Sequence, residues 1–504
     1  MSFLCNNVAA IVVALVASVL PWLYGGMRPD LLAAVAPWLL IMLVEVMICF
    51  PQRHHGESTY EARERVWHEL KHSPLVLVAL ILLAVLAIPF FNSGLCEICD
   101  AAKIAMGENS APPISFLPSC VNRGDHLDVF YWFALAFAAA ITTRICLNAN
   151  GQRLVLSLVV WNGVALAVLG FVQEATGAVC PYWIVPADGY VRREFFSSFL
   201  YTNTAGDYFV MLFGLAVALW RDHYEYARME EGALDPSEAA SSAKIVGGFW
   251  HRHYYLLPAA VFFVAALDTL SRAAIMLLTL TASVYFAHTA IIFLARLPKA
   301  RRVFVGVWSM VIFGVIIFFA TVFMPRNISR EVRTLDSVAV LDRMTGKGQY
   351  HTRVAFDIWK EHMVFGCGGW GYGHLSPSKL MEGEQVQLAG GINVHNDYLQ
   401  LLAEHGIVGF GLVVAAVVLL LCPVVVKWRR LSAALRFKKS RQMKVAVYTA
   451  SAFFIFVAML ATMIHAFGDC PLRSSATMVL FFVALSAMPA FMPREIDEDL
   501  PSEH

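Results

Sequence analysis

The amino-acid sequence predicts an all-α polytopic membrane protein with about 12 transmembrane helices. Of its 504 residues, 59% are hydrophobic and 15% are charged, and the mean hydropathy is +0.62. Soluble domains average about half apolar and about a quarter charged residues, so the composition excludes an ordinary soluble enzyme. The formal net charge of +1 gives no reason to expect a nucleic-acid partner.

Apolar runs long enough to cross the hydrocarbon core occupy most of the chain. They lie near residues 8–24, 31–50, 74–91, 129–147, 154–173, 199–220, 254–268, 273–294, 303–324, 406–426, 445–467 and 474–491. The first run is expected to be a span and not a cleaved signal peptide, because residues 1–24 lack a basic start and a small-x-small cleavage site. The runs at 129–147 and 254–268 are the weakest, since one ends on Arg144 and the other is short.

Lys and Arg residues in the short connections predict the orientation. Segments 51–73, 295–302 and 427–444 are rich in both, which places them and both termini, including the acidic tail 492–504, in the cytoplasm. On this topology, six cysteines lie on or near the outer side, where disulfides persist: Cys96, Cys99, Cys120, Cys180, Cys367 and Cys470. The CEIC motif has no second ligand pair at metal-site spacing, so disulfides or free thiols are favoured over zinc, with the pairing left open.

The largest non-membrane segment is an outward loop over residues 325–396. Its Lys and Arg residues predict a basic surface suited to phosphate or another anion. Val354 and Ile358 share a helical spacing that predicts an amphipathic helix. A glycine series with Trp370 follows this helix and has no P-loop lysine, so we expect a tight loop with aromatic faces for sugar rings or lipid, not a nucleotide site.

Several arginines near the expected membrane surface are candidates for binding an anion. Arg272 follows Ser271 at the start of a span, where a guanidinium and free backbone N–H groups can hold an anion; the alternative is a side chain that reaches the headgroups. Arg353 opens the amphipathic helix and could equally be a solvated charge. Arg192 and Arg193 could likewise bind an anion or be solvated surface charges.

A histidine and an aspartate are the candidates for acid–base chemistry. His395 lies at an outward membrane interface, and a near-neutral pKa lets histidine take a proton from a hydroxyl group. Its neighbour Asn396 can also be read as a helix cap. Asp469, in the last outward turn, could orient such a base, or it could form a structural salt bridge.

The stretch HNDYLQLLAEHGIVGFG resembles the signature of the O-antigen ligase and O-antigen polymerase superfamily. That signature is His, then Asn, Ser or Gln, nine free residues, and Gly-x-x-Gly followed by Gly, Thr or Tyr. His395, Asn396, Gly406 and Gly409 match, and Phe410 departs at the last position. SFLYTNTAGDYF, LSRAAIMLL, TRVAFDIWKEHMVFGCGGWGYG and HAFGDCPLR are similar to the family's other landmarks, so the resemblance covers about residues 195–490.

This resemblance implies a GT-C-like, inverting membrane glycosyltransferase that needs no metal or cofactor and acts on the periplasmic side of the bacterial inner membrane. The chain then divides into N-terminal helices with outward loops (1–198), the ligase-like membrane region (199–491) and a cytoplasmic tail (492–504). By resemblance the catalytic residues are His395, Arg272 and Arg353. The implied substrate-binding residues are Asn396, Arg192, Arg193, Asn203, Asp469 and Trp370.

The implied donor is a glycan on undecaprenyl pyrophosphate, and its acceptor is open. A ligase transfers the glycan to lipid A-core, a polymerase to a second lipid-linked repeat, and an O-oligosaccharyltransferase to a protein. A transporter or flippase of amphipathic anions is the alternative from another class. We find no internal repeat, and the distinctive polar residues gather at one face, which favours the enzyme.

Overall fold

The structure is a computed structural model. It describes residues 2–54, 56–93, 112–185, 195–233, 252–296, 347–379, 393–434 and 449–492, with the isolated residues Arg301, Gly306 and Val307. Several sequence predictions fall wholly or largely outside these residues. They are the span at 303–324, much of the loop 325–396, the tail 492–504, Arg192, Arg193, Cys96 and Cys99.

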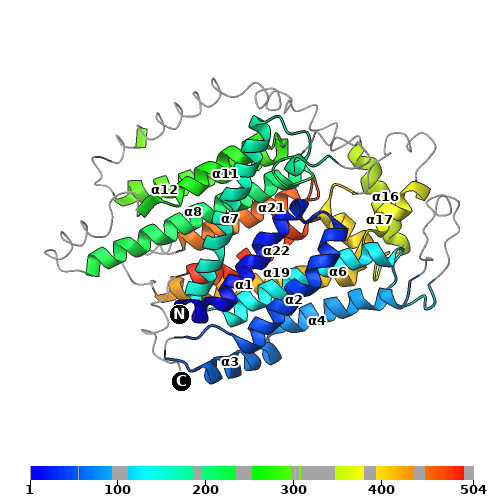
Figure 1. The fold of residues 1–504 in the computed structure, drawn as a ribbon, viewed down its shortest axis with the longest axis horizontal. Helices are drawn as coiled ribbons and strands as arrows, with labels where there is room; N and C mark the ends of the chain where they lie inside the picture. Colours follow the sequence, from blue (N-terminus) through cyan, green and yellow to red (C-terminus); the bar gives the residue numbers. More distant parts are fainter. Residues whose placement is uncertain are drawn as a thin grey trace.

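Over the described residues the chain is helical and contains no β-strand. The helices are α1 (Ser2–Trp22), α2 (Pro29–Cys49), α3 (Thr59–His72), α4 (Pro74–Ala87), α6 (Arg123–Ile141), α7 (Ala149–Ala175), α8 (Thr202–Ala233), α11 (Leu256–Asp268), α12 (Arg272–Arg296), α16 (Lys347–Glu361), α17 (Gly371–Lys379), α19 (Asp397–Ala434), α21 (Ala450–His465) and α22 (Ser475–Ala487) (Figure 1). The prediction of an all-α fold is confirmed.

Six helices among the described residues are long and apolar enough to cross a membrane: α2, α6 with the turn that follows it, α7, α8, α12 and α19. A seventh span exists if α3 and α4, which meet at 61°, are counted as one broken span. Four shorter apolar helices lie at Asn6–Trp22, Leu256–Asp268, Ala450–His465 and Ser475–Phe491. The protein is therefore a multi-pass membrane protein. Length and composition assign six or seven spans in the described part of the chain, so the expected number of 12 is not confirmed.

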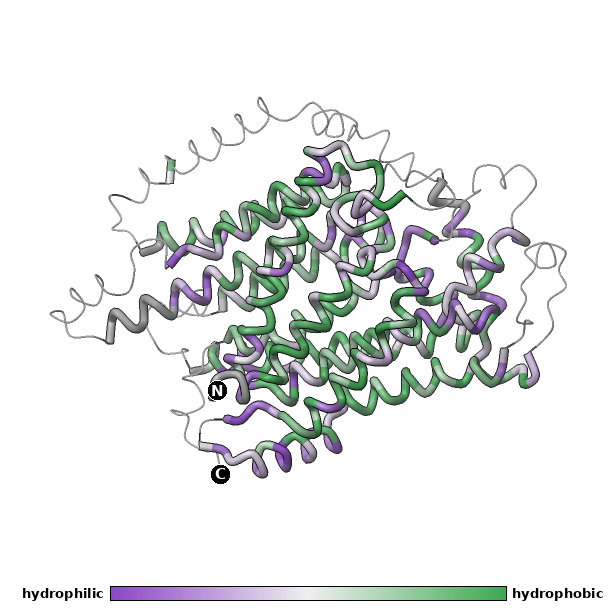
Figure 2. Tube along the Cα trace, viewed as in Figure 1, coloured by the Kyte–Doolittle hydropathy of each residue, from purple (hydrophilic) through white to green (hydrophobic). Residues whose placement is uncertain are grey.

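The helices differ in how much of their surface the protein covers. Nearly all of α8 up to Leu219 and all of α22 are buried, because α8 packs against α11, α12 and α21 while α22 packs against α1 and α6. In contrast, α2, α12 and α19 leave many large apolar side chains exposed, as expected of helices that face lipid. Figure 2 shows the hydrophobic colour along the bundle, with hydrophilic residues gathered around α16 and α17 at one end.

The amphipathic helix expected at the end of the loop is α16. Its apolar face, with Val354 and Ile358 at 1% and 0% exposure, packs in a small second core with residues of α17 and α19. This core attaches α16 and α17 to the start of α19. Helices α16 and α17 therefore form a helical cap over the start of α19, at one end of the bundle.

Helix α19 is broken at the point where this cap meets its membrane-spanning part. The sequence places the start of the span at Gly406, whereas the helix begins at Asp397 and is interrupted at Gly406, where φ is 62° and ψ is −170°. The glycine-rich segment 363–368 crosses α19 at the break. Four backbone hydrogen bonds join the two segments: Cys367 N to Ala403 O (3.1 Å), Gly368 N to Glu404 O (2.8 Å), Ile407 N to Met363 O (2.9 Å) and Val408 N to Val364 O (3.1 Å).

Candidate functional site

His395 stands at the start of α19, beside the turn that connects α21 to α22. Its Nδ1 atom lies 3.0 Å from Oδ1 of Asp469, which accepts the hydrogen bond. The backbone holds the two segments together, because the amide of Asp397 donates to the carbonyl of Ala466 at 2.9 Å. The Asn396 side chain donates to the carbonyl of Phe467 and caps α19 by accepting from the amide of Leu399. The contact with Leu399 is that of a helix cap, one of the two roles that the sequence suggests for Asn396.

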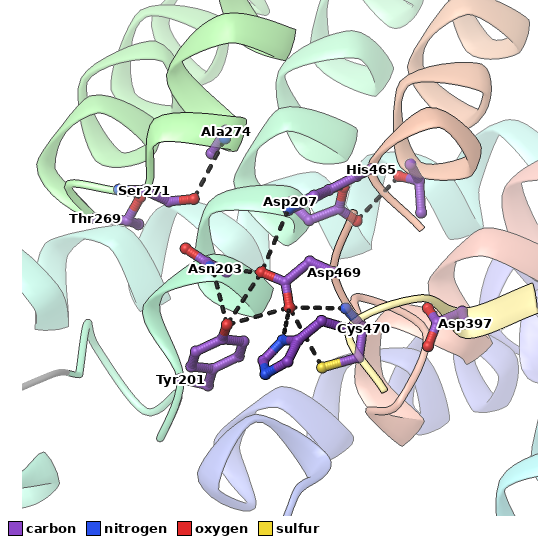
Figure 3. A network of polar contacts seen from close by, with 12 residues as sticks. Tyr201, Asn203, Asp207, Thr269, Ser271, Ala274, Asp397, His465, Asp469 and Cys470 are labelled. Atoms are coloured by element: carbon purple, nitrogen blue, oxygen red, sulfur yellow. Dashed lines mark hydrogen bonds and ion pairs between the residues drawn. The ribbon is translucent and has the colours of Figure 1, made fainter. Parts of the chain in front are cut away.

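Asp469 is the centre of the polar cluster in Figure 3. Its carboxylate accepts from the Tyr201 hydroxyl at 3.1 and 3.0 Å, from the Asn203 amide, and from the backbone amide of Cys470 at 2.8 Å. The Asp469 side chain is 7% exposed, whereas the His395 side chain is 46% exposed. The cluster thus holds the carboxylate from behind and leaves one side of the imidazole open to a substrate.

The site pairs the negatively charged carboxylate of Asp469 with the imidazole of His395, whose pKa is raised. Burial alone disfavours ionisation of Asp469, but the hydrogen bond with His395, the nearby His465 and the Cys470 amide outweigh it and lower the pKa of Asp469 to about 2. The same hydrogen bond raises the pKa of His395 above its ordinary value, against a smaller effect of burial. A partly exposed histidine oriented by a buried carboxylate is the arrangement of a general base.

A second histidine lies close to His395. The ring of His351, on α16, is 5.9 Å from the ring of His395 in an edge-on arrangement, and its Nδ1 atom is 2.8 Å from the Tyr372 hydroxyl. Burial, with a further effect of His395, lowers the pKa of His351 to about 4. The second histidine is therefore neutral at neutral pH, so it adds a hydrogen-bonding group without adding charge.

Behind Asp469 lies a fully buried histidine–aspartate pair. Nδ1 of His465, the last residue of α21, is 3.1 Å from Oδ1 of Asp207 on α8. Thr462 donates to the other oxygen of Asp207 at 3.0 Å, and Nε2 of His465 faces Oδ2 of Asp469 at 3.9 Å. Neither side chain is more than 1% exposed.

Arg272 lies at the end of α12 that packs beside α8, the helix that carries Asp207. It begins α12, and the preceding turn packs so closely on α8 that a Cβ added to Gly206 would lie 2.5 Å from Cβ of Ala274 and 2.9 Å from the Thr269 hydroxyl. Gly206 is three residues after Asn203, which bonds Asp469. Figure 3 shows the Thr269–Ala274 turn beside Asp207. The structure therefore brings the N-terminus of α12 near the cluster.

Arg353 and Trp370 have different surroundings. Arg353 is exposed and lies on the face of α16 opposite to His351, whose ring contacts His395. The Trp370 indole donates to Asp128 at 3.2 Å, and its ring stacks with Arg473 at 5.0 Å, so its contacts are with the protein. Arg192 and Arg193 lie outside the described residues.

A buried ion pair fixes the segment before His395. Arg473 binds Glu404 of α19 at 2.5 Å, and Glu404 accepts from Gln400 at 3.0 Å. Gln400 in turn accepts from the amide of Val394, the residue before His395, at 3.0 Å. This series explains how His395 is held in its left-handed conformation, with φ of 55°.

Among the residues that the structure describes, one group of side chains has the separation of metal ligands. Donor atoms of His395, Asp469 and Cys470 lie within 4.8 Å of one another. However, His395 and Cys470 both contact the same Asp469 oxygen, and burial raises the pKa of the Cys470 thiol well above its ordinary value. The short separations are explained by the hydrogen bonds among these residues.

Sequence reasoning found His395, Asn203 and Asp469, which the structure brings together. It missed Tyr201 and the Asp207–His465 pair. The available signal was spacing: Asp207 follows Asn203 by one helical turn, and His465 precedes Asp469 by four residues. His351 has the corresponding signal, since it precedes the buried Val354 and Ala355 on one helical face.

Residues 257–414 match the family model described as O-antigen ligase. The matched region contains Arg272, Arg353 and His395 and ends before Asp469. Comparison with curated proteins gives no match.

Proposed function

We propose that this protein, a member of the O-antigen ligase family by the match of its residues 257–414, transfers a glycan from undecaprenyl pyrophosphate to a hydroxyl group of an acceptor. The observation that carries the proposal is the His395–Asp469 pair, in which a buried carboxylate orients an imidazole side chain that is 46% exposed. The family match supports an enzyme of the ligase or polymerase type. The donor, the acceptor and the periplasmic location of the site are parts of the proposal.

In the proposed reaction, His395 is the general base. Its other nitrogen takes the proton of the acceptor hydroxyl, and the resulting oxygen attacks the anomeric carbon of the donor sugar. The bond from that carbon to the pyrophosphate oxygen breaks, and its electron pair leaves with the lipid pyrophosphate. A single displacement of this kind inverts the anomeric configuration. Asp469 holds the imidazole in the required tautomer and stabilises the cation that forms.

The leaving group gains negative charge, which cationic side chains can stabilise without a metal ion. We assign this role to Arg272 and Arg353. Arg272 is supported by its place at the N-terminus of α12, where helix amides add to the attraction for an anion. For Arg353 the support is the resemblance in sequence alone, since the side chain is exposed on the face of α16 opposite to His351.

The remaining expected residues complete the proposal with different support. Asn203 acts through Asp469, to which its amide is bonded, and Asn396 acts by capping the helix behind His395. Trp370 retains an edge for a sugar, since its side chain is only partly buried. For Arg192 and Arg193 the support is the sequence alone. Lipid A-core is the proposed acceptor, and a second lipid-linked repeat or a protein would be the alternative.

The test uses the full-length protein in vesicles. The donor is a lipid-linked glycan isolated from cells that lack this protein. We expect His395→Ala to abolish transfer to lipid A-core, whereas the matched change His362→Ala, at the residue that follows α16, retains it. Arg272→Lys keeps the charge but loses the two-pronged geometry, so its turnover should fall while insertion is normal. Normal turnover by a properly inserted His395→Ala protein would reject the proposal. Incorporation only into a second lipid-linked repeat would identify a polymerase.

A further inference from the structure

The buried pair of Asp207 and His465 has no part in the reaction as written above. It is nevertheless built around Asp469. One nitrogen of His465 is bonded to Asp207, and the other faces the Asp469 oxygen that accepts from Asn203. Three separate parts of the chain meet here: α8, the end of α21 and the turn after it.

The chemistry of this arrangement favours a proton on each nitrogen of His465. A buried carboxylate is costly unless a cation or hydrogen bonds compensate it, and this imidazole has a carboxylate on either side. Thr462 already donates to the second oxygen of Asp207, so the acceptor is held in place. The 3.9 Å separation from Asp469 is an ion-pair distance and too long for a hydrogen bond.

We propose that His465, anchored by Asp207, is a positioning residue that keeps Asp469 ionised and turned toward His395. The site then contains an unbroken series of Asp207, His465, Asp469 and His395, running from the core of the bundle to the exposed imidazole. The inference rests on the proposed function, because it assigns His465 an effect on the general base. It explains why a histidine and an aspartate are buried where apolar residues would pack with less cost.

Several other titratable groups surround this series and bear on its pH dependence. Tyr201 lies before α8, Cys470 follows Asp469, and Asp397 begins α19 near Arg473. Arg272 begins α12, which packs against both α8 and α21. None of these groups is altered in the variants below, so a change in the pH profile reports the loss of His465.

The experiment compares pH profiles of transfer for full-length His465→Asn, His465→Gln and the unaltered protein in vesicles. Asn can still donate to Asp207 but has no group toward Asp469, whereas Gln can reach Asp469 with a neutral donor. The matched control is His288→Asn, on α12, whose ring packs against Phe453 and Phe454 of α21.

We expect His465→Asn to lower kcat by roughly 10- to 100-fold, the range for residues that orient a functional group from behind. Loss of a nearby cation should raise the proton affinity of the Asp469–His395 pair, moving the acidic limb of kcat/KM upward by about 0.5 to 1 pH unit. His465→Gln should show the same shift with a smaller loss of kcat, and His288→Asn should show neither.

An acidic limb that stays in place in both variants would overturn the inference, whatever the loss of kcat, because a purely structural role predicts that result. If His465→Asn does not insert, His465→Gln carries the same decision. Failure of the proposed function has a different signature, namely full transfer by His395→Ala. A protein that depends on His395 but not on His465 would therefore keep the first proposal and lose the second.

Discussion

Replacing Gly406 with alanine should separate the membrane helix from the cap above it. At φ 62° and ψ −170°, this residue has a conformation that is essentially confined to glycine. A Cβ at this position would lie 2.2 Å from the carbonyl oxygen of Val364 and 2.5 Å from the amide nitrogen of Phe365. Both atoms belong to the backbone of the crossing segment, so neither can move aside as a flexible side chain would.

The size of the effect follows from these contacts. The strained backbone of a non-glycine residue costs about 1–3 kcal/mol. If the crossing also opens, its four hydrogen bonds are lost, at about 1 kcal/mol of net stability each. The free energy of unfolding should therefore fall by about 2 kcal/mol if the crossing survives and by about 6 kcal/mol if it opens.

The measurement is the thermal denaturation midpoint of the full-length protein in detergent, with transfer activity in parallel. Gly411→Ala is the matched control, because an added Cβ there meets nothing within 4 Å and Gly411 lies in the same helix. We expect Gly411→Ala to be as stable as the unaltered protein or slightly more stable, since alanine favours helix by up to about 1 kcal/mol. Equal midpoints and equal activity for the two variants would refute the reasoning about the crossing.

Three further results are expected at the site. Asp469→Asn should lower kcat by roughly 10²- to 10⁴-fold, since an amide cannot stabilise the cationic imidazole, and normal turnover would contradict this role. In the unaltered protein, kcat/KM should decline on acidification through a pKa above about 6.5, because Asp469 raises the pKa of His395 and the base must be neutral; the Asp469→Asn limb should lie at lower pH. Cys470→Ala should retain most of the activity, and a chelator should inhibit neither this variant nor the unaltered protein. Inhibition by a chelator that added zinc or magnesium reverses would establish a metal requirement.

The fold class could be predicted from composition because lipid-facing helices require apolar side chains. The boundaries could not. The first part of α19 has a cap signal at Asn396, but its polar composition hid its inclusion in a buried helix, because Glu404 is paired with Arg473, which is distant in the sequence. The number of spans is similarly hard to read, since α11 and α21 are apolar but short.

The exposed part of the site was accessible to sequence reasoning, and the buried part was not. His395 and Asp469 are conspicuous because they interrupt apolar sequence near expected membrane surfaces. Asp207 gives no such signal, since its meaning depends on His465, which is 258 residues away. The place of His351 was also hidden, because periodicity alone does not show that its ring contacts His395.

The turn that carries Asp469 is secured by the beginning of the chain. Ser474 and Ser475, at the start of α22, donate to the carbonyls of Gly25 and Gly26 at 2.5 and 3.2 Å. During synthesis, α1 must therefore wait for the last apolar helices to be inserted before this junction can close. Asp469 follows His395 by 74 residues, so His395 also lacks its carboxylate partner until that turn is made. A chain released before Asp469 would carry His395 without the carboxylate that binds its imidazole, so we expect the proposed activity to begin only after this last turn is made.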